Sequence, residues 1–253
     1  MIERRDRVIV VKDSRINIVE EGNPENQPII LLHGWGQNTE MMAPVVKGFE
    51  DKFHIVLIDL PGFGKSDEPT TAWTIDEYVY MVEVIVRKMK LKNPILIGHS
   101  FGGKVALEYT SYHHDVDKLI VFAPSFKAGV TDTNLKTKML KGLKRIPLLK
   151  IFEKWAKDHM GSVDYKNASP TMKQVLVQSV TSGIEHHLGR ITAPTIAIWG
   201  DLDDQVPLEQ AYELEQSIPD CGLIVYPGGT HYAYLEDLRK TRQILKNFLT
   251  EKE

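Results

Sequence analysis

The sequence contains very little cysteine, since Cys221 is the only one among 253 residues. One cysteine excludes an internal disulfide framework and a metal site built from cysteines, and it fits a reducing compartment. Uninterrupted apolar runs are also scarce. They reach about four residues, as in 29–32 and 55–58, whereas a membrane span needs roughly 20. Because no long apolar stretch follows the charged N-terminus, we expect no secretory signal, no membrane span and a cytoplasmic location.

Neither sign of charge is in large excess. The chain has 31 Lys and Arg against 34 Asp and Glu, a formal net charge of −3, and 42% of its residues are hydrophobic. A disordered chain would be less apolar or more one-sided in charge. A generally basic nucleic-acid-binding protein would carry a dominant basic stripe, and none is present. We therefore expect a folded protein of one large domain, or one domain with an insertion, and no nucleic-acid partner.

Short apolar runs rich in β-branched residues recur along the chain and predict strands that are buried on both faces of a sheet. Helical spacing of apolar residues separates several of these runs, and the helix over 75–89 begins with the capping box Thr74-x-x-Glu77. This alternation predicts an α/β fold with a mostly parallel sheet flanked by helices. The predicted strands are 29–32, 55–58, 95–97, 119–122, 195–199 and 223–226, and the other helices are 101–109, 208–218 and 235–249.

Residues 125–185 interrupt the alternation, because they contain no strand-like run. Three short helices are predicted there instead, over 134–145, 148–160 and 171–182. The segment holds 11 Lys and Arg against 5 Asp and Glu. Its lysines either attract an anionic substrate or form solvated helix faces, and their spacing favours the second interpretation. We expect a core made of 1–124 and 186–253 and a helical insertion at 125–185.

A pentapeptide at the end of one predicted strand carries the clearest chemical signal. Gly98-His99-Ser100-Phe101-Gly102 follows the strand 95–97 and precedes a predicted helix, which is the setting of a G-x-S-x-G nucleophile elbow. Such a sharp turn lifts one side chain above the sheet and crowds the backbone, so the residues two before and two after must be small. The start of the following helix favours an anion at the same place.

A serine hydroxyl needs a base, and His231 is the best placed of the nine histidines. It follows the last predicted strand, so its loop lies at the same carboxyl edge of the sheet as Ser100. A carboxylate is then needed to orient the imidazole. The loop after the strand 195–199 offers three candidates, which are Asp201, Asp203 and Asp204. No carboxylate or third histidine stands at a spacing that would complete a metal site.

These blocks together resemble the α/β-hydrolase fold family over nearly the whole chain outside the insertion. The resemblance rests on His33-Gly34-Trp35-Gly36, the block Asp59 to Ser66, the elbow, the block Gly200 to Pro207, and Gly229-Thr230-His231. It implies that Asp203 is the acid of the triad and that the oxyanion hole is formed by the backbone N–H groups of Trp35 and Phe101. It also implies that the insertion is a cap. Most of its apolar residues are expected to pack the cap onto the core, and a few are expected to line an acyl pocket.

The block Asp59 to Ser66 ends in Gly64-Lys65-Ser66, like a Walker A motif. The first glycine of that motif would fall at Asp59, so a phosphate cradle is excluded and a tight structural loop is expected. His33 is expected to make hydrogen bonds within its own loop.

These observations predict a serine hydrolase that cleaves small-molecule carboxylic esters through an acyl-enzyme, with Ser100, His231 and Asp203 as its triad and without a metal or cofactor. Lactonase and thioesterase activities are alternatives on the same fold. A carbon–carbon bond hydrolase is disfavoured, because members with that activity typically have Trp after the catalytic His and this chain has Tyr232. A ligand receptor with slow or absent hydrolysis is a further alternative, and the intact triad argues against it.

Overall fold

The computed structural model describes residues 4–128 and 168–250, and its centre is an eight-stranded sheet. The strands are Arg5–Val11 (β1), Ser14–Glu21 (β2), Pro28–Leu32 (β3), His54–Ile58 (β4), Ile95–His99 (β5), Lys118–Phe122 (β6), Thr195–Gly200 (β7) and Cys221–Tyr226 (β8). Their order is β1-β2-β4-β3-β5-β6-β7-β8. The six strands from β3 to β8 are parallel, while β1 and β2 pair antiparallel and extend the sheet beyond β4.

All six predicted strands are confirmed, each one or two residues longer than expected. β1 and β2 were not predicted. β1 is an edge strand in which five of seven residues are exposed, so it lacks the apolar run of a strand buried on both faces. In β2 the buried polar residues Ser14, Asn17 and Glu20 interrupt the apolar pattern. A search for short apolar runs therefore does not find either strand.

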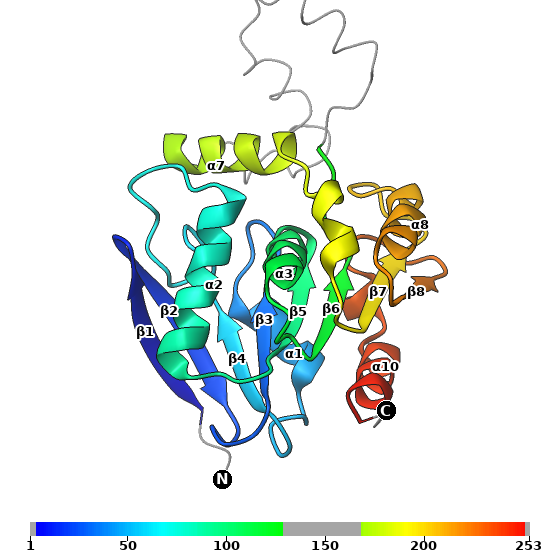
Figure 1. Cartoon of the computed structure of the whole chain (residues 1–253), viewed down its shortest axis with the longest axis horizontal. Helices are drawn as coiled ribbons and strands as arrows, with labels where there is room; N and C mark the ends of the chain where they lie inside the picture. The colour runs from blue at the N-terminus through cyan, green and yellow to red at the C-terminus, as the bar shows by residue number, and fades with distance from the viewer. Residues whose placement is uncertain (1–3, 129–167, 251–253) are drawn as a thin grey trace, which may run out of the picture.

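Helices cover both faces of the sheet (Figure 1). Ile75–Met89 (α2), Ser100–Tyr112 (α3) and Leu208–Ser217 (α8) pack on one face, and Thr39–Val46 (α1) and Leu238–Thr250 (α10) pack on the other. Each face of the sheet has its own hydrophobic core, and alternate residues of a strand point into one core or the other. In β3, Ile30 and Leu32 belong to the first core, whereas Ile29 and Leu31 belong to the second. The predicted burial on both faces is confirmed for β3 to β7. It is wrong for β8, which lies at the edge of the sheet and is mostly half-buried.

The helix predictions are confirmed for α2, α3 and α8, and the capping box of Thr74 and Glu77 is formed in full. The single C-terminal helix predicted over 235–249 is wrong in detail. It consists of a short helix, Ala233–Glu236 (α9), followed by α10, with a break at Asp237. Helix α1 was not predicted, because it has only eight residues and contains Pro44.

Pro170–Thr181 forms α7, the third helix predicted in the insertion. It lies along the edge of the molecule toward which the parallel strands point (Figure 1). Met172 of α7 packs against Gly62 in the loop after β4. The other two helices predicted in the insertion, with their apolar residues and lysines, lie outside the described residues, so the core and cap boundaries stay a prediction.

A buried lysine joins α7 to α3. Lys104 is fully buried, and its ammonium donates hydrogen bonds to the carbonyl oxygens of Ser179, at 2.6 Å, and Ser182. These carbonyls lie at the C-terminal end of α7, where the helix dipole favours a cation. Burial lowers the pKa of Lys104 to about 8, against the weaker opposing influence of Glu185 and Glu108. Lys104 therefore holds the end of α7 in place, and the free-energy cost of burying its charge depends on pH.

The contribution of Lys104 to stability should rise with pH. Between about pH 8 and 10 the folded protein has released this proton while the unfolded chain keeps it, because an exposed lysine titrates near 10.4. The unfolding free energy of wild type, relative to Lys104→Met, should therefore increase by up to about 1.4 kcal/mol per pH unit. Urea unfolding of both proteins at several pH values measures this difference. A difference that stays constant from pH 7.5 to 9.5 would contradict the prediction.

Candidate active site

Ser100 is the first residue of α3, directly after β5 ends at His99. Its backbone has a φ of 49°, in the left-handed region that residues with a side chain rarely adopt. Ser100 is partly exposed, whereas residues 95–99 are buried. The turn thus presents a hydroxyl at the carboxyl edge of the sheet, at the start of a helix whose dipole favours negative charge.

Two glycines flank Ser100 because the backbone leaves no room for side chains there. A Cβ on Gly98 would lie 2.6 Å from the carbonyl oxygen of Gly102. A Cβ on Gly102 would lie 2.4 Å from the carbonyl oxygens of Leu32 and His33, at the end of β3. The N–H of Gly102 also donates to His33 O at 3.1 Å. The predicted need for small residues on both sides of Ser100 is confirmed.

His231 and Asp203 form a buried pair across two loops. His231 lies after β8 and Asp203 after β7, and His231 Nδ1 is 2.8 Å from Asp203 Oδ2. The other carboxylate oxygen, Asp203 Oδ1, accepts the N–H groups of Gln205 and Val206, each at 2.8 Å. The carboxylate is therefore held on one side by its own loop, and its free side faces the imidazole.

The three candidate aspartates are placed differently. Asp201 is exposed, and its Oδ1 accepts the N–H of Gly228 at 2.7 Å, which supports the loop that leads to His231. Asp204 is exposed and makes no hydrogen bond to another described residue. Only Asp203, of these three, contacts the imidazole.

The elbow and the His231 loop meet through His99. The ring centroids of His99 and His231 are 4.8 Å apart, and His99 Nε2 lies 3.2 Å from the carbonyl oxygen of His231. The hydroxyl of Ser100 makes no hydrogen bond within residues 4–128 and 168–250. The structure therefore joins Asp203 to His231 directly and places His231 beside the turn that carries Ser100.

The loop after β3 also reaches the elbow. A Cβ on Gly34 would lie 2.6 Å from His99 Nδ1, and Gly36 has a φ of 71°, so both glycines are needed for this close path. The backbone N–H groups of Trp35 and Phe101 make no hydrogen bond to another described residue. Both donors are thus available to a ligand near Ser100, Trp35 from this loop and Phe101 from the start of α3.

His33 fixes this loop to the neighbouring one. Its Nε2 accepts the N–H of Leu60 at 2.9 Å, so the proton is on Nδ1, which donates to Gly34 O at 2.7 Å. Complete burial lowers the pKa of His33 to about 4 and keeps the ring neutral, against opposing influences that include Asp59. The structural role predicted for His33 is confirmed, and it extends beyond its own loop to Leu60.

Asp59 is a structural centre that the sequence analysis did not identify. Its carboxylate accepts a hydrogen bond from Asn17 Nδ2 and the backbone N–H groups of Thr39 and Lys65, at 2.7–2.9 Å. A Cβ on Gly64 would lie 2.3 Å from this carboxyl group. The block Asp59 to Ser66 is confirmed as a tight structural loop. The residues around Asp59 give no signal of this role, because its donors Asn17 and Thr39 are distant in the sequence.

Aromatic rings line the same region. The Trp35 ring makes T-shaped contacts with Phe63 and Phe101, at centroid distances of 4.9 and 5.5 Å, and Phe101 contacts Tyr78 at 5.0 Å. Trp35 and Phe63 are partly buried, so these two rings offer apolar surface near the elbow. Sequence reasoning assigned the apolar lining to the insertion and missed Phe63, although it lies in the block Asp59 to Ser66.

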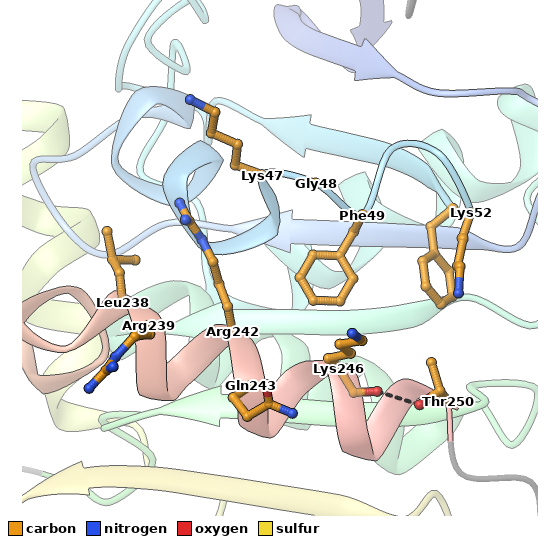
Figure 2. Close-up of a pocket in the computed structure, with 11 residues that line it drawn as sticks. Lys47, Gly48, Phe49, Lys52, Leu238, Arg239, Arg242, Gln243, Lys246 and Thr250 are labelled. Carbon is orange, nitrogen blue, oxygen red and sulfur yellow. Dashed lines mark hydrogen bonds between the residues drawn. The ribbon is translucent and has the colours of Figure 1, made fainter.

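A groove at the opposite end of the sheet lacks this chemistry. It has a volume of about 640 Å³ and lies between the loop after α1 and α10 (Figure 2). Phe53, one of the lining residues, directly precedes β4, so the groove is near the amino ends of the parallel strands. Its lining is rich in cations and includes no histidine, cysteine or carboxylate among the described residues. The lining cations are Lys47, Lys52, Arg239, Arg242 and Lys246.

Other site types find little support in residues 4–128 and 168–250. No three His, Cys, Asp or Glu side chains there are grouped so that they could hold a metal ion. No helix of that part of the chain combines the length and apolar character needed to cross a bilayer.

Comparison with known proteins defines the family. Residues 27–157 match the family model of the alpha/beta hydrolase fold, so the chain belongs to this family. A pimeloyl-[acyl-carrier protein] methyl ester esterase of Vibrio vulnificus is 26% identical, over 83% of this chain and 89% of that protein. A 2-hydroxy-6-oxononadienedioate/2-hydroxy-6-oxononatrienedioate hydrolase of Pseudomonas is 27% identical, over 92% of this chain and 91% of that protein. The crystal structure of a putative lipase from Acinetobacter baumannii is similar to this fold, with a TM-score of 0.78 at 19% identity. The match covers 97% of this chain and 91% of that chain.

Gly98→Ala should destabilise the protein by about 1–3 kcal/mol, because the new methyl group meets backbone atoms that cannot rotate away. Gly222→Ala is the matched control. Gly222 lies on β8, and a Cβ there would have no neighbour within 4 Å, so the change should stay within about 0.5 kcal/mol. Urea unfolding of the two variants measures both values. Equal effects at the two positions would show that crowding at the elbow is not what excludes a side chain.

Proposed function

We propose that this protein is a serine hydrolase that cleaves carboxylic esters of small molecules. The observation that carries the proposal is the buried pair of His231 and Asp203 beside the turn in which Ser100 has a φ of 49°. The nucleophile begins the helix after β5, and the base and the acid lie in the loops after β8 and β7. Their chain order is the order Ser, Asp, His that this fold uses. The free N–H groups of Trp35 and Phe101 supply the oxyanion donors.

Each residue has one task in the proposed reaction. Ser100 Oγ attacks the ester carbonyl carbon while its proton passes to His231 Nε2. Asp203 holds the other ring nitrogen and stabilises the imidazolium that forms. The N–H groups of Trp35 and Phe101 donate to the oxyanion. The imidazolium then protonates the leaving alcohol, and an acyl group remains on Ser100.

Water completes the cycle. His231 removes a proton from water, which attacks the acyl-enzyme and releases the acid and the free Ser100 hydroxyl. A hydrogen bond from the Ser100 hydroxyl to His231 must form during this cycle. Catalytic hydrogen bonds of this kind often shorten only when the substrate is bound. In this scheme no step requires a metal or a cofactor. The apolar surface of Trp35 and Phe63, together with the predicted cap at 125–185, would hold the acyl chain.

Carbon–carbon bond hydrolysis is a second candidate, because a relative named for a 2-hydroxy-6-oxo-dienoate is as similar to this chain as the esterase is. The same triad can serve both reactions, so identity does not separate them. The residue after the base is Tyr232, whose ring lies 5.4 Å from that of His99. Parallel assays with aryl esters and with a 2-hydroxy-6-oxo-dienoate, followed by loss of the dienol absorbance, separate the two activities.

Ser100→Ala should abolish ester hydrolysis and leave the fold intact. Removing a triad nucleophile costs on the order of 10⁶ in kcat. A panel of aryl esters of graded acyl length supplies the substrates. Labelling by a fluorophosphonate should occur in wild type and be lost in the variant. Residual activity within tenfold of wild type would contradict the assignment of Ser100. A wild-type protein that neither labels nor turns over would instead support a ligand receptor.

The three aspartates should differ sharply in their effect on rate. Asp203→Asn should lower kcat by about 10⁴, because the amide no longer holds the imidazole in the tautomer that accepts a proton from serine. Asp201→Asn and Asp204→Asn are matched controls from the same loop, and we expect them to lose less than about tenfold. The kcat values of the three variants decide this. A larger loss in Asp204→Asn would mean that the acid is one residue further along.

A further inference from the structure

His99, the residue before Ser100, makes contacts that its place in the motif does not require. It is 1% exposed, so it cannot touch a substrate directly. One ring nitrogen, Nε2, lies 3.2 Å from the carbonyl oxygen of His231, and the other, Nδ1, lies 3.2 Å from Gln37 Oε1. The ring also lies against Tyr232 and Tyr234, at centroid distances of 5.4 and 4.8 Å. His99 thus connects the elbow with the loops after β3 and β8.

Both polar partners of His99 are acceptors. Gln37 Oε1 already accepts the N–H of Gly34 at 3.1 Å, which fixes it as the oxygen of the amide. The partner of Nε2 is a peptide carbonyl. A neutral imidazole has one N–H and can therefore satisfy only one of the two acceptors.

An imidazolium could satisfy both, but the surroundings oppose the charge. Burial lowers the pKa of His99 well below its usual value, and the neighbouring His231 and His33 act in the same direction. No carboxylate hydrogen-bonds to His99 in the described structure. One proton must therefore be assigned to one of two positions.

The two acceptors differ in how much it costs to leave them without the hydrogen bond from His99. Gln37 Oε1 has Gly34 as a donor and belongs to a partly buried side chain. The carbonyl of His231 belongs to a buried residue, and among the described residues its donor is His99. A buried carbonyl without a donor costs about 1–3 kcal/mol. The proton is therefore best placed on Nε2.

We propose that His99 is a positioning residue, which uses an Nε2–H donor to hold the peptide of His231 and so sets the position of the base relative to Ser100. The proposal rests on the proposed serine hydrolase function. Asp203 fixes the imidazole of His231 from the side chain, and His99 fixes the same residue from its backbone. A shift of about 1 Å in a reacting group can cost 10²-fold in rate.

Two amide substitutions separate the contacts of His99. In His99→Gln the amide nitrogen can occupy the place of Nε2 and donate to His231 O. In His99→Asn it can occupy the place of Nδ1, toward Gln37, and the contact with His231 is lost. We expect His99→Asn to lower kcat for an aryl ester about 10- to 100-fold with KM changed less than threefold. His99→Gln should retain kcat within about fivefold of wild type. Equal kcat losses in the two variants, or a change in KM alone, would overturn the proposal.

Wild-type protein provides a test that needs neither turnover nor a folded variant. In ¹⁵N-histidine-labelled protein, correlation of ring protons with ring nitrogens identifies the protonated nitrogen of His99. We expect Nε2–H, and an Nδ1–H tautomer would overturn the proposal. Fluorophosphonate labelling of the same sample reports separately on Ser100. An Nε2–H tautomer without labelling would mean that the hydrolase function fails while the contact between His99 and His231 stands.

Discussion

The arrangement of the site depends on direct backbone contact between the end of β3 and the start of α3. Gly102 packs against the carbonyl oxygens of Leu32 and His33 so closely that a Cβ would lie 2.4 Å from each, and its N–H bonds to His33. This contact holds the loop that carries Trp35 against the elbow, and the backbone N–H groups of Trp35 and Phe101 make no hydrogen bond to another described residue. His33 then ties that loop to Leu60. Because backbone atoms hold the site, its geometry does not rely on long flexible side chains.

Asp203 and His231 both lie at the carboxyl edge of the parallel sheet. β7 and β8 lie beside one another in the sheet, so the loops that carry Asp203 and His231 start as neighbours. A Cβ on Gly200, at the end of β7, would lie 2.2 Å from the carbonyl oxygen of Gly229, which shows how closely the two loops pack. Asp201 adds a hydrogen bond to Gly228 in the same place. Loop packing therefore holds Asp203 and His231 in place, in addition to the hydrogen bond between their side chains.

The sequence predicted the parallel strands and the glycine-flanked turn at Ser100 well, because both depend on local signals. Apolar runs identify strands buried on two faces, and glycines mark turns where a Cβ does not fit. The parts that were missed depend on distant partners. β1 is stable because it pairs with β2 at an edge, and nothing in its seven residues shows that partner. Asp59 looks like one more surface aspartate until Asn17, Thr39 and Lys65 are seen to donate to it.

Three buried histidines lie near Ser100, and their surroundings explain why one of them is suited to be the base. His33 is satisfied as a neutral ring, since Nε2 accepts from Leu60 and Nδ1 donates to Gly34. His99 faces two neutral oxygens and no carboxylate. Burial without a charged hydrogen-bond partner depresses the pKa of both rings, so a proton taken from serine would not be held there. His231 alone of the three makes a hydrogen bond to a carboxylate, through Nδ1, which leaves Nε2 to accept a proton and gives the resulting cation a partner. Of these three rings, His231 is therefore the one whose surroundings fit the base of the proposed triad.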